Sequence, residues 1–172
     1  RITDLETDLG VQLVNRTTRS VVATELGQTY YESCLDILER IDAATEAAEK
    51  AGADRVELGV ATQLGGVTPS YGIIKEVLKS INIPVYVLIR PREGDFEYTE
   101  EEFQSVIDDI EMCKELGCHG VVTGFLTKEG RIDKVRTKQA LQASENMDFT
   151  FHRAFDQLDD LAEGLQDLIA LG

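Results

Sequence analysis

The spacing of hydrophobic positions along the chain changes near residue 50. Before that point, apolar residues recur at helical intervals over 1–9 and again over 25–50, separated by a polar turn and a short β-branched run. After it, short β-branched runs alternate with amphipathic segments. The pattern therefore divides the chain into residues 1–50 and residues 51–172.

The first segment has the signals of a helix, a short hairpin and a long helix. Gly10 follows the first apolar repeat and is placed to end that helix as a C′ glycine. Thr24 directly precedes the second repeat and is expected to cap the long helix over 25–50.

The second segment predicts an α/β fold. Strands are expected over 54–60, 84–90, 119–125 and 148–154, and helices over 70–81, 99–117, 133–145 and 158–171. Such alternation favours parallel strands joined by right-handed crossovers. The repeat of about thirty residues fits part of a (β/α)8 barrel, but a flavodoxin-like open sheet has similar periodicity.

Composition and charge narrow the function. The chain carries 17 Lys+Arg against 32 Asp+Glu, a formal charge of −15, so its field repels nucleic-acid phosphates and anionic membrane surfaces. No apolar run approaches the ~18 residues of a membrane span. The three cysteines, Cys34, Cys113 and Cys118, are scattered, which favours a reducing, cytoplasmic location.

Charged and imidazole side chains interrupt the predicted strands late in their course. Strands covered on both faces are normally near-continuous aliphatics, yet Glu57, Arg90, His152 and Arg153 fall there. Ligands of α/β folds bind at the carboxyl ends of strands. We therefore expect Glu57, Arg90 and His152 to converge on one cavity and neutralise one another. The alternative is a structural ion-pair network closing a barrel mouth.

Two loops strengthen the hypothesis of an anion site. LGGVTPSYG contains a glycine pair, Thr68 and Ser70, and Ser70 is placed to cap a helix whose first N–H groups then face an anion. RPREGDFEY places Arg92 beside Asp95. The alternative for the first loop is a tight, capped connection without a ligand.

DLETDLGVQLVNRTTRSVVATELGQTYYESC resembles the winged helix-turn-helix of LysR-type transcriptional regulators. In that resemblance, residues 1–9 are the end of the recognition helix, 15–24 the wing and 25–48 the linker helix that pairs two subunits. The helix turn that meets base edges is absent. Arg16 and Arg19 are then candidate phosphate contacts, which position a protein without specifying sequence, so only weak DNA binding is expected.

AGADRVELGVATQLGGVTPSYG, IPVYVLIRPREGDFEYTEEEF, LGCHGVVTGFLTKEGRID and FTFHRAFD together resemble the CutC family, named for copper homeostasis and built as a (β/α)8-type barrel. For residues 51–172 the resemblance implies about four βα units of a TIM-type barrel, a cytoplasmic location, a polar pocket at the carboxyl ends of the strands and a link to Cu(I). The pocket residues it carries over are Glu57, Thr68, Ser70, Arg90, Arg92, Asp95, Thr123, His152, Arg153 and Asp156.

The chain also departs from that family. Gly59 stands where the family usually has a cysteine after RVEL, and further βα units are expected after Gly172. A partial barrel exposes two strand edges, so we expect self-association into a homo-oligomer. Three hypotheses follow: a CutC-like protein binding copper or a small anion, a LysR-type regulator fragment, and an inactive chimera.

The sequence supports copper less directly than the family name does. Cu(I) prefers thiolate and thioether ligands, but Cys113 and Cys118 have no recognised metal-binding spacing and are expected to be small buried side chains. His152 is a candidate copper ligand. It is alternatively a general acid or base, or a hydrogen-bond donor to a bound anion, with Glu57 setting its charge state.

Overall fold

The computed structural model describes residues 2–16 and 21–172, without the side chains of Asp8, Leu38, Asp42 and Thr45. It divides into two compact units, Arg1–Ala44 and Thr45–Gly172. Each unit is considered by itself.

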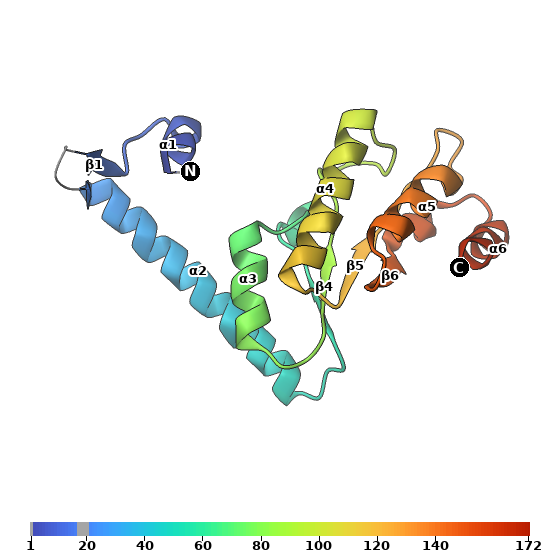
Figure 1. Cartoon of the computed structure of the whole chain (residues 1–172), viewed down its shortest axis with the longest axis horizontal. Helices are drawn as coiled ribbons and strands as arrows, with labels where there is room; N and C mark the ends of the chain where they lie inside the picture. The colour runs from blue at the N-terminus through green and yellow to red at the C-terminus, as the bar shows by residue number, and fades with distance from the viewer. Residues whose placement is uncertain (1, 17–20) are drawn as a thin grey trace. The chain divides into compact units, whose positions relative to one another are not determined.

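The first unit contains the predicted helix, hairpin and long helix. Its elements are α1 (Ile2–Leu9), β1 (Val14–Arg16), β2 (Val21–Ala23) and most of α2 (Glu25–Lys50), drawn in blue in Figure 1. β1 and β2 pair antiparallel. Gly10 follows α1 with φ at 68°, and the Thr24 hydroxyl accepts the N–H of Gly27 at 2.9 Å. Both expected helix boundaries are confirmed.

The second unit is an α/β fold around one parallel sheet, as predicted. Its strands are β3 (Val56–Leu58), β4 (Val85–Leu88), β5 (Gly120–Thr123) and β6 (Asp148–Phe151). They are followed by α3 (Tyr71–Ser80), α4 (Glu100–Leu116), α5 (Lys134–Ala143) and α6 (Leu161–Leu171), with short 3-10 helices η1 (Thr62–Leu64) and η2 (Arg153–Gln157). The strands pair in chain order, β3-β4-β5-β6 (Figure 1). This order lacks the reversal of a doubly wound open sheet and agrees with successive strands of a barrel.

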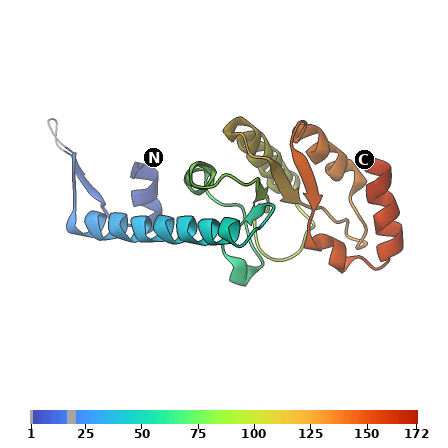
Figure 2. The same cartoon turned by 90° about the horizontal axis from the view of Figure 1, so that it is seen from below.

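The helices along the sheet begin at side-chain caps and pack against their neighbours. Ser70, Thr99, Asp133 and Asp160 accept backbone N–H groups at the starts of α3, α4, α5 and α6. α4 packs beside α5, and α5 beside α6 (Figure 2). Of the described helices, none combines the length and the apolar character that crossing a membrane would require.

The two faces of the sheet differ in chemistry. Val85, Val87 and Val121 are at most 1% exposed, on the face whose side chains are packed away from solvent. On the opposite face, Tyr86 stands level with Gly120, and a Cβ on Gly120 would lie 2.5 Å from the Tyr86 ring. We call this second side the open face of the sheet.

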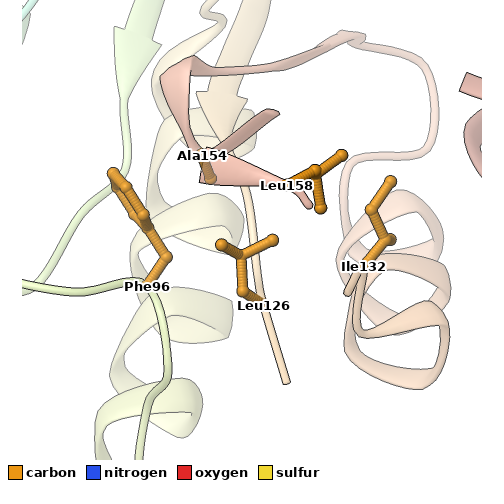
Figure 3. Packing of buried hydrophobic residues seen from close by; sticks show 5 residues of the cluster. All are labelled: Phe96, Leu126, Ile132, Ala154 and Leu158. Atoms are coloured by element: carbon orange, nitrogen blue, oxygen red, sulfur yellow. The ribbon is translucent and has the colours of Figure 1, made fainter. Parts of the chain in front are cut away.

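A hydrophobic cluster joins the loops beyond the carboxyl ends of the strands. Its buried members come from the loops after β4 and β5 and from η2 (Figure 3): Phe96, Leu126, Ile132, Ala154 and Leu158. Burial of this cluster fixes the loops that carry the candidate site.

Candidate functional site

Arg90 follows β4 and is 1% exposed, the largest fully buried side chain of the described residues. Its Nη1 donates to the carbonyls of Leu64 and Gly66, at 3.3 and 2.9 Å, and its Nη2 donates to that of Gly94 at 2.7 Å. Its Nε has no partner. Carbonyl oxygens accept hydrogen bonds but carry no net charge. The positive charge of the buried guanidinium is therefore not neutralised by these partners.

A second guanidinium lies close to the first. Gly65 has φ at 86°, and a Cβ built on it would lie 3.1 Å from Nη1 of both Arg90 and Arg153. The two nitrogens are therefore separated by no more than about twice that distance. Neither arginine belongs to any ion pair within residues 2–16 and 21–172. Two unneutralised cationic groups thus meet around one glycine.

His152 lies beside these arginines in its neutral form. The residue is 9% exposed, and its Nδ1 accepts the N–H of Ala154 at 3.3 Å. Nε2 therefore carries the proton in this tautomer, and it is buried without a partner. Burial, then the positive charges of Arg90 and Arg153, lower the pKa of His152 to about 4. The expected control by Glu57 is not seen, because burial and the two arginines, rather than Glu57, shift the pKa of His152.

Phe96, which the sequence analysis did not single out, spaces the three polar side chains. Its ring centroid lies 4.8 Å from that of His152 in an edge-on arrangement. The guanidinium carbons of Arg90 and Arg153 lie 4.9 and 5.9 Å from the same centroid. An aromatic face stabilises cations that have been removed from water. Gly124 permits this packing, since a Cβ there would lie 2.7 Å from His152 Nδ1.

A hollow of about 340 Å³ opens beside Arg153. Its lining comes from β3, the loop after β3, the open face of β4 and β5, and the start of η2: Glu57, Leu58, Gly59, Thr62, Gly65, Gly66, Leu88, Val122 and Arg153. A small molecule in this space would meet the exposed guanidinium of Arg153.

Glu57 does not meet Arg90 and His152, contrary to expectation. It pairs in register with Tyr86, which lies level with Asp148 across β5. Arg90 and His152 come four residues after Tyr86 and Asp148, roughly 13 Å along extended strands. The exposed carboxylate of Glu57 instead pairs with Arg55 at 2.9 Å. Glu57 thus lines the same hollow as Arg153, but it stands level with Tyr86, which donates a hydrogen bond to Asp148.

Thr68 and Ser70 hold the loop between β3 and α3. The Thr68 hydroxyl accepts the N–H of Arg90 at 2.9 Å and lies 3.2 Å from the Arg90 carbonyl oxygen, to which it donates. Ser70 Oγ accepts the N–H of Ile73 at 3.4 Å, the cap expected from the sequence. Both side chains therefore shape the loop, and neither faces Arg153 or His152 through a recorded contact.

Arg92 is fully engaged by its own loop. Its Nε donates to Glu102 at 2.6 Å and its Nη2 to Asp95 and the Glu97 carbonyl, at 2.9 and 2.7 Å. These bonds lower the pKa of both carboxyl groups. Arg92 thus organises the segment that carries Phe96, and its donors are not directed at the hollow.

The side chains of the two remaining pocket candidates make no contact with these groups among the described residues, although the Thr123 carbonyl accepts the N–H of His152 at 3.1 Å. Thr123 is 1% exposed, and by the alternation of the strand it shares the buried side of β5 with Val121. Asp156 is exposed on η2.

The candidate DNA contacts belong to the first unit. Arg16 ends β1, with its Nη2 3.6 Å from Glu6. Arg19 lies outside the described residues.

The carboxyl ends of the strands do not fit a metal cation. Across the described residues, no three His, Cys, Asp or Glu side chains gather in a metal-binding group. His152 has two guanidinium groups as its charged neighbours, and these repel a cation. Arg153 lines the hollow, whereas His152 Nε2 and Arg90 Nε are buried without partners; guanidinium and N–H groups of this kind suit an anion better than a cation.

Comparison with known proteins agrees with the second resemblance noted in the sequence. A family model described as the CutC family matches residues 29–172, a longer stretch than the expected 51–172. The LysR-type resemblance finds no support in these comparisons.

Several bacterial proteins are similar over much of the chain. A family protein CutC from Pasteurella multocida (strain Pm70) is 45% identical over 141 residues, which cover 82% of this chain and 56% of that protein. One from Klebsiella pneumoniae (strain 342) is 46% identical over 130 residues, covering 76% and 53%. The chain thus spans about half the length of the curated relatives it matches.

A solved structure shares the fold. It is that of a candidate copper homeostasis protein, CutC, from Streptococcus agalactiae, with a TM-score of 0.68 and 39% sequence identity. The match covers 72% of this chain and 61% of that structure.

Proposed function

Because the chain belongs to the CutC family, we propose that it contributes to copper homeostasis as a binding protein for a small oxyanion, held at the carboxyl ends of a partial (β/α)8 barrel. The sequential parallel order of β3 to β6 supports the barrel, as does the likeness to the S. agalactiae structure. A cytoplasmic location, suggested by the scattered cysteines, is part of the same proposal.

One observation carries the proposal: a fully buried arginine without a carboxylate partner. Arg90 is 1% exposed, and the carbonyls of Leu64, Gly66 and Gly94, rather than a carboxylate, accept its hydrogen bonds. In a chain of formal charge −15, carboxylates are abundant, so the uncompensated positive charge around Gly65 is a local property of this site. A buried charge is costly unless it is paired, and a bound anion supplies the missing partner.

Each group has a distinct task in this site. Arg153 is exposed and forms the charged contact that an arriving anion meets first. His152 is neutral near pH 7, since its pKa is about 4, and acts as a hydrogen-bond donor through Nε2. Arg90 contributes charge and its Nε–H, while its other nitrogens hold the two loops together. Phosphate and carboxylate groups share the acceptor geometry that this set requires.

Copper is not placed in this pocket. The guanidinium groups repel a cation, and the imidazole Nδ1 that would bind copper already accepts the Ala154 N–H. The link to copper homeostasis therefore rests on family membership, with the anion as the ligand of the pocket.

Titration calorimetry of the whole chain with inorganic phosphate, and separately with acetate, tests the proposal. Arg153→Ala removes a charged hydrogen-bond donor, and we expect affinity to fall about tenfold to a hundredfold. Arg131→Ala is the matched control, because it removes one exposed positive charge from another loop. Absence of binding by the parent chain, or equal losses in both variants, would refute the anion site.

The regulator hypothesis is tested separately. α1, the hairpin and α2 have the order that the resemblance requires, but the family match begins at residue 29. Retardation of DNA in a gel at low salt is expected to be weak and independent of sequence. Tight, sequence-specific retardation would instead favour the regulator.

A further inference from the structure

The hollow beside Arg153 has side chains of opposite charge at its two ends. Glu57 and Arg153 both line it. Glu57 stands level with Tyr86 on the open face of the sheet, whereas Arg153 follows His152 beyond the carboxyl end of β6. The levels of Glu57 and His152 are four residues apart along the strands, roughly 13 Å. One hollow therefore extends from a carboxylate to a guanidinium group.

Between these charged ends the wall of the hollow is apolar. Leu88 and Val122 pair in register on β4 and β5, and both line the hollow. On the side of β3 the lining residues are Gly59 and Gly66, where a Cβ would lie 3.0 and 2.6 Å from Cδ2 of Leu88. The absence of side chains at these two glycines leaves the space beside Leu88 open to a hydrocarbon group.

The carboxylate of Glu57 can accept a further hydrogen bond. Its Oε1 accepts from Nη2 of Arg55 at 2.9 Å, and Oε2 has no recorded partner among the described residues. The guanidinium of Arg55 also lies over the ring of Tyr86, 4.5 Å from its centroid. The side chains of Arg55 and Glu57 are 46% and 48% exposed. Exposed ion pairs are weak, so an amino group of a ligand can share the carboxylate with Arg55.

We propose, on the basis of the anion site proposed above, that the ligand of this hollow is an elongated zwitterion. Its oxyanion group binds Arg153, its hydrocarbon body covers Leu88 and Val122, and its amino group donates to Glu57. A volume of about 340 Å³ is sufficient for a small molecule of this kind. Inorganic phosphate fills only the Arg153 end.

The far end of the hollow then selects among ligands that share the same anionic group. An amino group gains a charged hydrogen bond to Glu57, a methyl group gains none, and a second carboxylate is repelled by Glu57. Arg55 does not reverse this order, because Glu57 and the ring of Tyr86 already engage it. Glu57 is thus the residue that determines specificity, and Arg153 supplies the affinity common to all three ligands.

The test is titration calorimetry of the whole chain with three probes that share a carboxylate and an eight-carbon body: ω-aminooctanoate, octanoate and octanedioate. We expect ω-aminooctanoate to bind about threefold to tenfold more tightly than octanoate, and octanedioate to bind more weakly than either. ω-Aminobutanoate should have no advantage over butanoate, because its shorter body does not reach Glu57 from Arg153.

Two substitutions at the far end should change this preference in opposite directions. Glu57→Gln should abolish the advantage of ω-aminooctanoate over octanoate, and Arg55→Gln should increase it by removing the competing donor. Glu145→Gln is the matched control, because it removes one exposed carboxylate from another loop. Arg153→Ala should weaken all three probes alike. Urea unfolding verifies that each variant is folded.

The outcomes separate this inference from the anion site on which it rests. Binding of phosphate and octanoate without a preference for ω-aminooctanoate, or a preference that survives Glu57→Gln, would overturn the zwitterion and leave the anion site in place. Absence of binding by phosphate and by every probe would overturn both.

Discussion

Replacing His152 by glutamine removes the one buried imidazole of the described chain and tests the lowered pKa assigned to it. The free energy of unfolding of the parent should depend on pH through this residue. In the unfolded chain the imidazole titrates near its ordinary pKa of 6.5, whereas in the folded protein its pKa is about 4. Protons therefore bind the unfolded chain first as pH falls.

The direction and size follow from these two values. Stability from the neutral imidazole is fully present above pH 6.5, declines as pH falls from about 6.5 to about 4, and then levels off. At about 1.4 kcal/mol for each tenfold difference in proton affinity, the loss is on the order of 3 kcal/mol. His152 is only 9% exposed, so solvent screening reduces this figure little.

The assay is urea unfolding of parent and His152→Gln at several pH values between 7.5 and 3.5 (chosen to bracket both pKa values). The many carboxylates titrate in both proteins, so the difference between them isolates the imidazole. His119→Gln serves as the control, because His119 is the only other histidine and is exposed. A difference between parent and His152→Gln that stays constant across the range would refute the depressed pKa that burial and the neighbouring arginines give His152.

Three further predictions concern Gly65, the bond between Glu102 and Arg92, and the two edge strands of the sheet. Gly65→Ala should cost roughly 1–2 kcal/mol of stability because its φ is positive, and it should also weaken phosphate binding. Gly52 has φ at 84°, and a Cβ added there would have no other atom within 4 Å. Gly52→Ala should therefore lower stability alone in the same unfolding and calorimetric assays. Glu102→Gln should lower stability by about 0.5–1 kcal/mol through its bond to Arg92 and leave phosphate affinity unchanged, with Glu101→Gln as the neutral control. β3 and β6 each have one strand partner among the described residues, so light scattering after size exclusion should show self-association; a monomer at every concentration would contradict this.

Local sequence signals predicted the elements closely because their causes are local. Ser70 and Thr24 cap helices where expected. The expected helix over 158–171 begins only at Leu161, because the Asp160 carboxylate accepts the first free N–H groups. β3 is shorter than the expected 54–60, since Val60 leaves the sheet and pairs antiparallel with Val67.

The site was only partly predictable from sequence. Arg90 and His152 meet because their strands flank β5, whose Gly124 leaves room for the imidazole. Glu57 was misplaced because strand register, which pairs it with Tyr86, is a tertiary property. Arg92 was assigned to the ligand because its carboxylate partner, Glu102, is ten residues away along the chain.

The sequence analysis did not identify two residues that shape the site, Gly65 and Phe96. Gly65 matters because two guanidinium groups approach it, and a glycine pair alone does not reveal that approach. Phe96 is buried between Arg90 and His152, but an isolated phenylalanine in a polar loop is equally typical of ordinary packing.

The central claim is that an uncompensated pair of arginines binds an oxyanion at the carboxyl ends of the strands. Its most direct measurement is the ¹H–¹⁵N spectrum of the arginine Nε–H groups during addition of inorganic phosphate. The Arg90 and Arg153 signals should shift together and saturate, while that of Arg92, held by Glu102, stays in place. Signals of Arg90 and Arg153 that do not respond to phosphate would contradict the account.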